Sequence, residues 1–167
     1  MKVFLVLPTI LLVVIIRNHK HWVTHEKIKD IVAFNFWRHV FYATALSFIG
    51  FNIIASLTSS NDTTTQTIIS LPIVYVYSIL FSPLIEELIC RKFMFGWLDK
   101  RFGFIIAALT SSLFFAIPHF SLSQVLGYIW LGLVWSWHYK KSGNILVTIV
   151  SHSIYNHIVI LLMSMGG

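Results

Sequence analysis

Apolar and polar stretches alternate along the whole chain. Short polar connections separate six apolar segments, which cover approximately residues 3–16, 40–57, 68–89, 102–118, 125–139 and 145–163. A helix needs about 20 predominantly apolar residues to cross a bilayer, where open strands would leave backbone groups unsatisfied. The pattern therefore predicts an all-α protein, a polytopic transmembrane helix bundle of about six helices. No small-residue cleavage site follows the short first segment, which favours a retained span over a signal peptide.

Composition also indicates a membrane protein. Of the 167 residues, 57% are hydrophobic and 11% are charged, and the mean hydropathy is +0.80. Soluble domains carry about 25% charged residues, so a soluble enzyme domain and a disordered tail are excluded. The single cysteine, Cys90, excludes a disulfide scaffold and a cysteine-based zinc cluster. The length suits one integral membrane domain.

The distribution of charge predicts an orientation. Twelve Lys and Arg face six Asp and Glu, which gives a net charge of +6. The basic residues fall in alternate connections, at 17–38, 91–101 and 140–141, whereas those at 58–67 and 120–124 contain no Lys or Arg. Because basic loops stay in the cytoplasm, we expect a multi-pass protein of the cell membrane with its basic loops inside. The positive charge is then explained by the lipid bilayer as partner, and we expect no nucleic-acid binding.

Only two of the six acidic residues, Glu86 and Glu87, lie in an apolar segment. Ionisable groups within spans are costly to bury and are often functional. In a helix Glu87 shares a face with Arg91, four residues later, and the two can form an ion pair. Glu86 is turned about 100° away and keeps its carboxyl group for general acid–base chemistry. In the structural alternative, both glutamates only neutralise Arg91 and Lys92 at the membrane boundary.

Polar residues in two later segments can join these acids. His119 ends one span, and His152 and Asn156 share one face of another because they are four residues apart. His152 lies about 12 Å into its span, which argues against an interfacial position. The structural alternatives are an interfacial His119 and an interhelical hydrogen-bonded pair of His152 and Asn156. We interpret two further histidines as structural or interfacial: His138 and His157.

Three familiar intramembrane protease patterns are absent. The pair His25-Glu26 lacks the second histidine of a zinc-binding H-E-x-x-H helix, the aspartates lie in loops, and no serine stands in G-x-S-x-G. Three ordered motifs remain, E-E-x-x-x-R, F-x-x-x-H and H-x-x-x-N, formed by Glu86, Glu87, Arg91, Phe115, His119, His152 and Asn156. In order and spacing they resemble the CPBP family of CAAX-type prenyl proteases and bacteriocin-processing and immunity proteins, also called Abi proteins. The likeness covers about residues 70–160.

The resemblance implies an intramembrane protease core at residues 66–167, after N-terminal spans and a basic cytoplasmic loop at residues 1–65. It implies that a glutamate-activated water hydrolyses a peptide bond in a membrane-associated peptide or protein. The expected substrates are a prenylated protein, a bacteriocin or a pheromone precursor.

The resemblance also implies roles for individual residues. Glu86 activates the water and His119 assists it, while His152 and Asn156 stabilise the oxyanion. Glu87 is counted with these four as catalytic, and together with Arg91 it holds the helix and the local charge. Arg91 and Phe115 are supporting residues.

Alternatives to this chemistry and function stay open. Glu86, His119 and His152 can instead hold a zinc ion with a water in its open position, although we favour a metal-free glutamate mechanism because segment 68–89 offers no second strong ligand. A non-catalytic bacteriocin self-immunity membrane protein on the same fold is the main alternative function, and a proton-relay transporter is a third. The complete motif set favours the enzyme.

The expected helix boundaries conflict with a single site. If one span ends near Ile89 and the next begins at Phe102 on the same side, Glu86 and His119 differ in depth by about 25 Å. One site then requires the helix at 102–118 to begin below the membrane plane, to tilt, or to break at Pro118.

Overall fold

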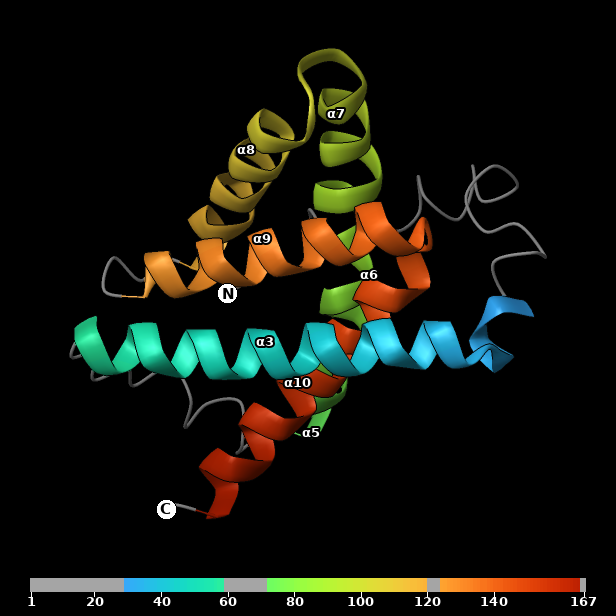
Figure 1. Cartoon of the computed structure of the whole chain (residues 1–167). Coiled ribbons are helices and arrows are strands. Elements are labelled where there is room, and N and C mark those ends of the chain that lie inside the picture. Colours follow the sequence, from blue (N-terminus) through green and yellow to red (C-terminus); the bar gives the residue numbers. More distant parts are fainter. Residues whose placement is uncertain (1–28, 59–71, 120–123, 166–167) are drawn as a thin grey trace.

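The computed structural model describes residues 29–58, 72–119 and 124–165, and the first expected span, at 3–16, lies outside them. The described chain is helical between short connections and contains no strand. A 3₁₀ turn, Asp30–Val32, precedes the first long helix. Five helices follow (Figure 1): α3 (Phe34–Thr58), a long helix that ends at Phe102, α8 (Phe104–Ala116) with a 3₁₀ turn (Ile117–His119), α9 (Val125–Ser142) and α10 (Ile145–Met165). The all-α prediction is confirmed.

The long helix contains three α-helical parts and two π-helical parts. They are α5 (Pro72–Val76), a π segment (Tyr77–Phe81), α6 (Ser82–Glu87), a second π segment (Leu88–Phe95) and α7 (Gly96–Phe102). π-helical turns are rare in proteins, but many of those that occur lie at functional sites. Both glutamates of the predicted site lie in α6, between these two segments.

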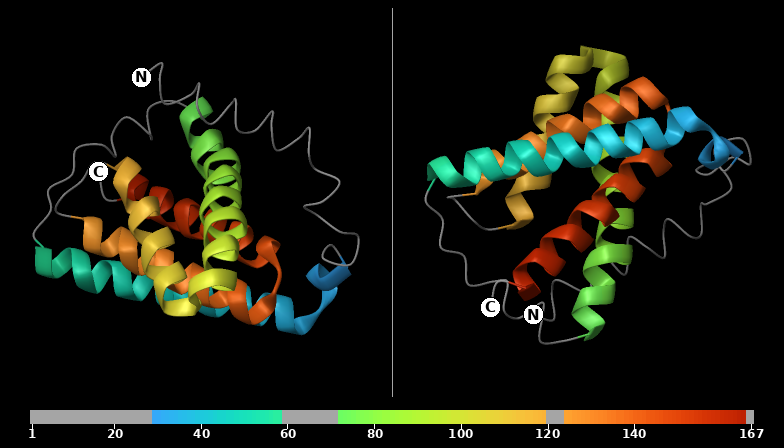
Figure 2. Two further views of the ribbon diagram at one scale, coloured as in Figure 1. Left: turned by 90° about the horizontal axis from the view of Figure 1, so that it is seen from above. Right: turned by 60° about the horizontal axis from the view of Figure 1, so that its bottom comes forward.

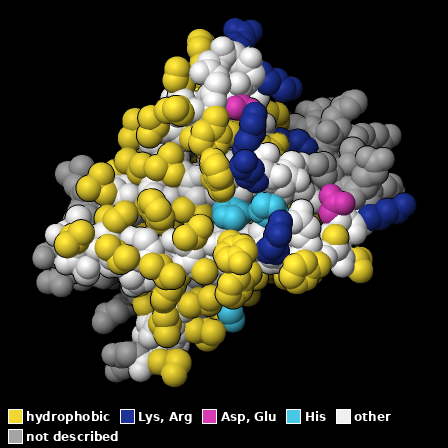
Figure 3. All heavy atoms as spheres, viewed as in Figure 1, with side chains coloured by type: hydrophobic (Ala, Val, Ile, Leu, Met, Phe, Trp, Pro, Cys, Tyr) yellow, Lys and Arg dark blue, Asp and Glu magenta, His cyan; other side chains and the backbone are white. Residues whose placement is uncertain are grey.

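Three of the described helices are long and apolar enough to cross a membrane, judged by length and composition: Phe34–Thr58, Ile73–Phe102 and Ile145–Met165. The helix that ends at His119 is apolar but shorter. Large apolar side chains are exposed along each of these helices, and Figure 3 shows them over much of one face. A lipid environment accommodates such a surface, so the predicted membrane bundle is confirmed.

The helices cross around one shared core. In Figures 1 and 2, α3 and α9 run side by side in opposite directions, and both cross the long helix. The α8 helix packs against α7 and α9, and α10 packs against α3 and α6. The central cluster draws on all five of these helices: Ala43, Cys90, Phe115, Leu131, Val134, Trp135 and Tyr155.

The expected end of the third span near Ile89 is wrong. The helix continues to Phe102, and the stretch 93–98, expected as a separate amphipathic piece, is part of it. The helix ends before Gly103, whose φ of 79° is a conformation that favours glycine. The helix can continue past Ile89 because Arg91 is fully buried and paired with Glu87, so its charge does not have to reach water. A charge that indicates a loop in the sequence therefore lies inside the bundle.

This longer helix removes the expected difference in depth between Glu86 and His119. The chain rises along α7 to Gly103 and returns along α8, which packs against the same helix (Figure 1). The two paths, 86 to 103 and 103 to 119, are nearly equal, at about 25 Å each for 1.5 Å per residue. His119 therefore returns to about the level of Glu86, in the 3₁₀ turn that follows α8.

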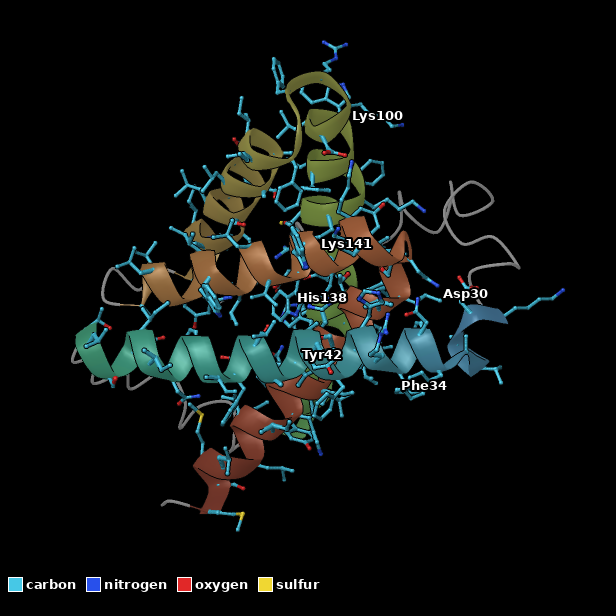
Figure 4. The ribbon with its side chains drawn as sticks, in the orientation of Figure 1. Asp30, Phe34, Tyr42, Lys100, His138 and Lys141 are labelled. Carbon is cyan, nitrogen blue, oxygen red and sulfur yellow. The ribbon has the colours of Figure 1, made fainter. Side chains whose placement is uncertain are left out.

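Basic side chains from the ends of α7 and α9 gather on one part of the surface. Lys100 and Arg101 lie in the last turn of α7, and Lys140 and Lys141 lie in the last turn of α9. Figure 3 shows Lys and Arg side chains following one another from the end of α7 towards the start of α3, and Figure 4 labels Lys100 and Lys141. Lys140 also forms an ion pair with Asp99 of α7.

A glycine allows α8 and α9 to approach closely. A Cβ atom at Gly132 would lie 2.6 Å from the Cβ atom of Ser112 and 2.7 Å from its Cα atom, whereas at Gly96 the nearest atom would be 3.6 Å away. We expect Gly132→Ala to lower the free energy of unfolding by about 1–3 kcal/mol, because the added methyl group overpacks this contact. Thermal unfolding in detergent measures it, with Gly96→Ala as the control. Equal melting temperatures for the two variants would contradict the close approach.

Candidate active site

The two glutamates of α6 have different surroundings. The Glu87 side chain is fully buried, and its Oε2 atom lies 3.3 Å from Nε of Arg91, which is buried to the same extent. This is the ion pair expected from the four-residue spacing. The Glu86 side chain is 30% exposed and accepts a hydrogen bond from the hydroxyl group of Ser82, one turn earlier. Glu86 is therefore the carboxyl group that a water molecule or a substrate can reach.

His152 lies between the two carboxylates. Its Nδ1 atom is 3.1 Å from Oε1 of Glu87, and its Nε2 atom is 3.9 Å from Oε2 of Glu86. A carboxylate can only accept a hydrogen bond, so the Nδ1–H group donates to Glu87, and Nε2 is the ring nitrogen that faces Glu86. The arrangement joins α10 to α6 through a carboxylate–imidazole pair that fixes the tautomer.

Aromatic rings enclose the buried charges. The indole of Trp135 is stacked on the imidazole of His152, with ring centroids 4.0 Å apart and an angle of 21° between the planes. The guanidinium carbon of Arg91 lies 4.6 Å from the ring centroid of Phe115 and 5.5 Å from that of Trp135. Its two terminal nitrogens have no hydrogen-bond partner among the described residues. Cation–π contacts and Glu87 therefore stabilise Arg91 within the bundle.

His119 lies in the 3₁₀ turn that follows α8, at the edge of this group. Its Nδ1–H group donates to the backbone carbonyl of Phe115, at 3.0 Å, because a carbonyl can only accept. Its ring is stacked on Tyr128 at a centroid distance of 3.7 Å. It also meets the ring of Phe115, at 5.1 Å between centroids, and Phe115 in turn meets the ring of His152 at 5.7 Å. The neutral ring then presents Nε2 as an acceptor.

Asn156 connects α10 to the first π segment. Its side-chain amide donates to the backbone carbonyl of Ser78, at 2.8 Å, about two turns before Glu86. Asn156 thus lies on the same face of α10 as His152 but is tied to a lower part of the long helix. Its amide keeps a second N–H group for another acceptor.

The structure brings together most of the predicted site residues and separates the other histidines from them. Nδ1 of His138 lies 3.1 Å from Nδ1 of His39, and Figure 4 shows His138 between α9 and α3. Nδ1 of His157 lies 2.8 Å from the Tyr75 hydroxyl group, and the residue is exposed. Neither joins the carboxylates.

No three histidine, cysteine or acidic side chains among the described residues are grouped so that they could hold a metal ion. The three expected zinc ligands are therefore not assembled as a ligand cluster: Glu86, His119 and His152.

Several neighbours of the site were not among the residues expected from the sequence. Ser82 could have been found, because it precedes Glu86 by four residues in a helix. Trp135 and Tyr128 could not, because an aromatic residue in an apolar span has the same pattern whether it contacts lipid or a histidine of the site. They stack on His152 and His119 respectively.

Comparison with known proteins gives one family and two relatives. The family model described as type II CAAX prenyl endopeptidase Rce1-like matches residues 68–158, more than half of the chain. The chain is 32% identical over 93 residues to the Bacillus subtilis protein named "Putative membrane peptidase YdiL", covering 56% of this chain and 38% of that protein. It is 31% identical over 97 residues to the Staphylococcus aureus "Membrane-embedded CAAX protease MroQ", covering 54% of this chain and 39% of that protein.

These matches confirm the resemblance to CAAX-type proteases inferred from the motifs. The aligned part spans about two fifths of the length of each of these relatives. No solved structure matches the chain. The matched residues begin after α3, so they cover the site residues but not that helix.

Proposed function

Because the chain belongs to the type II CAAX prenyl endopeptidase Rce1-like family, we propose that it is an intramembrane endopeptidase. It hydrolyses a peptide bond in a membrane-associated peptide or protein. The position of His152 carries the proposal, since its ring nitrogens lie 3.1 Å from Glu87 and 3.9 Å from Glu86 inside an apolar bundle. A purely structural pair of glutamates would need no histidine between them.

In the proposed reaction, Glu86 is the general base. It takes one proton from a water molecule. Nε2 of His119 accepts a hydrogen bond from the other O–H group of that water and so orients it. The water oxygen attacks the carbonyl carbon of the scissile peptide bond. The free N–H group of Asn156 donates to the oxyanion that forms. Glu86 is suited to this role because it is the partly exposed member of the pair.

In this proposal His152 carries the proton to the leaving group, rather than stabilising the oxyanion as the resemblance implies, because its Nδ1–H group is directed at Glu87. Glu86 passes it to Nε2 of His152, and the resulting imidazolium donates it to the amine nitrogen as the C–N bond breaks. The 3.9 Å separation of Nε2 from Glu86 shortens in the substrate complex, as catalytic hydrogen bonds commonly do. Glu87 balances the imidazolium charge, and Arg91 balances the charge of Glu87 between turnovers. The protein thus returns to its starting state.

The surroundings of the site indicate the class of substrate. The site lies within a bundle whose outer surface is apolar, so a peptide held at the bilayer reaches it more easily than a soluble one. A prenylated protein, a bacteriocin or a pheromone precursor has this property. The basic ends of α7 and α9 form the cytoplasmic side in our proposal, since they gather on one part of the surface.

Two histidines of α10 provide a matched test. We expect His152→Ala to lower the rate of peptide hydrolysis by about 10²-fold, because it removes the proton carrier. His157→Ala should leave the rate within about twofold, because His157 is exposed and its hydrogen bond is to Tyr75, not to either carboxylate. Both variants are purified in nanodiscs and supplied with a library of apolar peptides, and cleavage is followed by mass spectrometry.

The same experiment separates the enzyme from an immunity protein. Absence of cleavage by the unaltered protein, or equal cleavage by both variants, would overturn the proposal. A protein that protects cells from a peptide toxin without cleaving it would be the non-catalytic alternative on the same fold.

A further inference from the structure

Hydrogen bonds connect α3 to the helix that carries His152. The hydroxyl group of Thr44, in α3, donates to Oγ of Ser151, in α10, at 3.1 Å. The indole Nε1–H group of Trp135, in α9, donates to the same oxygen at 3.1 Å. All three side chains are buried, and Ser151 and Trp135 are fully buried. One hydroxyl oxygen therefore joins three helices next to the site.

This connection fixes the plane of the indole ring. A stacked ring that has only apolar neighbours can tilt and slide, but a hydrogen bond from Nε1 removes that freedom. Phe115 meets the same indole edge-on, at 5.6 Å between centroids and an angle of 89°. Trp135 is thus held at its N–H group by Ser151 and on its ring by Phe115.

The indole in turn fixes the imidazole of His152. The hydrogen bond from Nδ1 to Glu87 holds one end of the imidazole but leaves it free to swing about that bond. The stacked indole, at 4.0 Å and 21°, removes this rotation. Nε2 then points towards Glu86 before the substrate binds. Substrate binding therefore does not have to pay an entropy cost for orienting this ring.

We propose that Thr44, Ser151 and Trp135 are positioning residues that hold His152 in its productive orientation. The proposal rests on the proposed function, and it extends the catalytic unit to α3. The α3 helix lies outside the matched residues 68–158, yet its Thr44 hydroxyl group is the first donor in this series of hydrogen bonds. The competing explanation is that the same hydrogen bonds only hold α3 against α10.

A set of variants on α3 separates these explanations. Thr44→Val keeps the shape of the side chain and removes the hydroxyl group, whereas Thr44→Ser keeps the hydroxyl group. Ser47 is the matched control, because it lies nearly one turn away, is fully buried, and has a hydroxyl group without a hydrogen-bond partner among the described residues. Ser47→Ala therefore removes a buried hydroxyl group of α3 and leaves the contacts from Thr44 through Ser151 and Trp135 to His152 unchanged.

The first readout is kinetic. In nanodiscs, with apolar peptides as substrates, we expect Thr44→Val to lower kcat about tenfold with KM unchanged, because the catalytic geometry loosens while binding does not. The pH profile of kcat should also change. Thr44→Ser and Ser47→Ala should keep kcat and its pH profile. If Thr44→Val lowers kcat no more than Ser47→Ala, or if Thr44→Ser fails to rescue it, the positioning role is overturned.

The second readout does not depend on activity. Nitrogen-15 NMR of histidine-labelled protein reports the protonation and hydrogen bonding of each imidazole nitrogen, and the signals of His152 are those lost in His152→Asn. We expect Thr44→Val and Trp135→Phe to shift both His152 signals, while Thr44→Ser and Ser47→Ala leave them in place. Unchanged signals in Thr44→Val would overturn the proposal.

The two readouts also distinguish two failures. If the unaltered protein cleaves no peptide but the His152 signals move as expected, the proposed function fails while the positioning of His152 stands. If it cleaves peptides and the signals do not move, the proposed function stands and the positioning chain is wrong.

Discussion

Glu86→Gln should reduce peptide hydrolysis on the order of 10³-fold while the protein folds normally, because an amide cannot take a proton from water. The substitution keeps the size of the side chain, and its amide can still accept a hydrogen bond from Ser82, so packing should not change. The rate is measured with purified protein in nanodiscs, and the fold is checked by thermal unfolding. A larger loss than for His152→Ala is expected, since Glu86 starts the reaction.

Asp99→Asn provides the control for this change. Asp99 is an acid of the same long helix that pairs with Lys140 away from the site, so its loss should leave the rate within about twofold. Activity that survives Glu86→Gln would show that another group activates the water. If Glu87→Gln abolished activity while Glu86→Gln did not, the roles of the two glutamates would have to be exchanged.

Arg91→Met should destabilise the protein by about 3–5 kcal/mol, because it leaves the carboxylate of Glu87 buried without its cation. Both side chains are fully buried, and water cannot replace the missing partner. Replacing both members, as in Glu87→Leu with Arg91→Met, should restore most of the stability, since two apolar side chains of similar size leave no buried charge. The double variant should remain inactive, because His152 has lost its carboxylate.

Thermal and denaturant unfolding of the single and double variants tests this expectation. Arg101→Met is the matched control: Arg101 also contacts an aromatic ring, with its guanidinium carbon 4.6 Å from the ring centroid of Trp97, but it is exposed. Arg101→Met should lower the free energy of unfolding by less than about 1 kcal/mol. A double variant as unstable as Arg91→Met alone would contradict the idea that the unpaired charge causes the loss.

Much of the site could be predicted from spacing alone. Residues four apart in a helix share a face, which correctly joined Glu87 to Arg91. The depth of His152 in its span correctly placed it inside the bundle. The ordered motifs indicated the family, because each polar residue in an apolar span is costly and a set of them is informative.

The boundaries of the helices could not be predicted in the same way. Hydropathy assumes that a charged residue lies in water, so Arg91 and Lys92 were expected to end a span. In the structure, Glu87 and two aromatic rings contact Arg91, and the helix continues for a further eleven residues, to Phe102. The partners of a charge decide whether it can be buried, and two of the partners of Arg91, Phe115 and Trp135, come from other helices.

The contacts between helices could not be predicted from the sequence either. The stacking of Trp135 on His152, and the bonds of Trp135 and Thr44 to Ser151, join α9, α3 and α10. Periodicity describes one face of one helix, and three of the helices here are apolar enough to span a membrane. Which apolar faces meet is set by side-chain shape and by the crossing of the helices.

The origin of the oxygen in the new carboxyl group tests the central claim most directly. The purified protein in nanodiscs is given a farnesylated peptide with a C-terminal Cys-aliphatic-aliphatic-Met sequence, together with the library of apolar peptides, in ¹⁸O-labelled water under single-turnover conditions. We predict that the first product carries one ¹⁸O atom at its new carboxyl group and that the protease peptide containing Glu86 carries none. Absence of any cleavage, or ¹⁸O in the Glu86 carboxyl group, would contradict a glutamate that acts as the base for an attacking water.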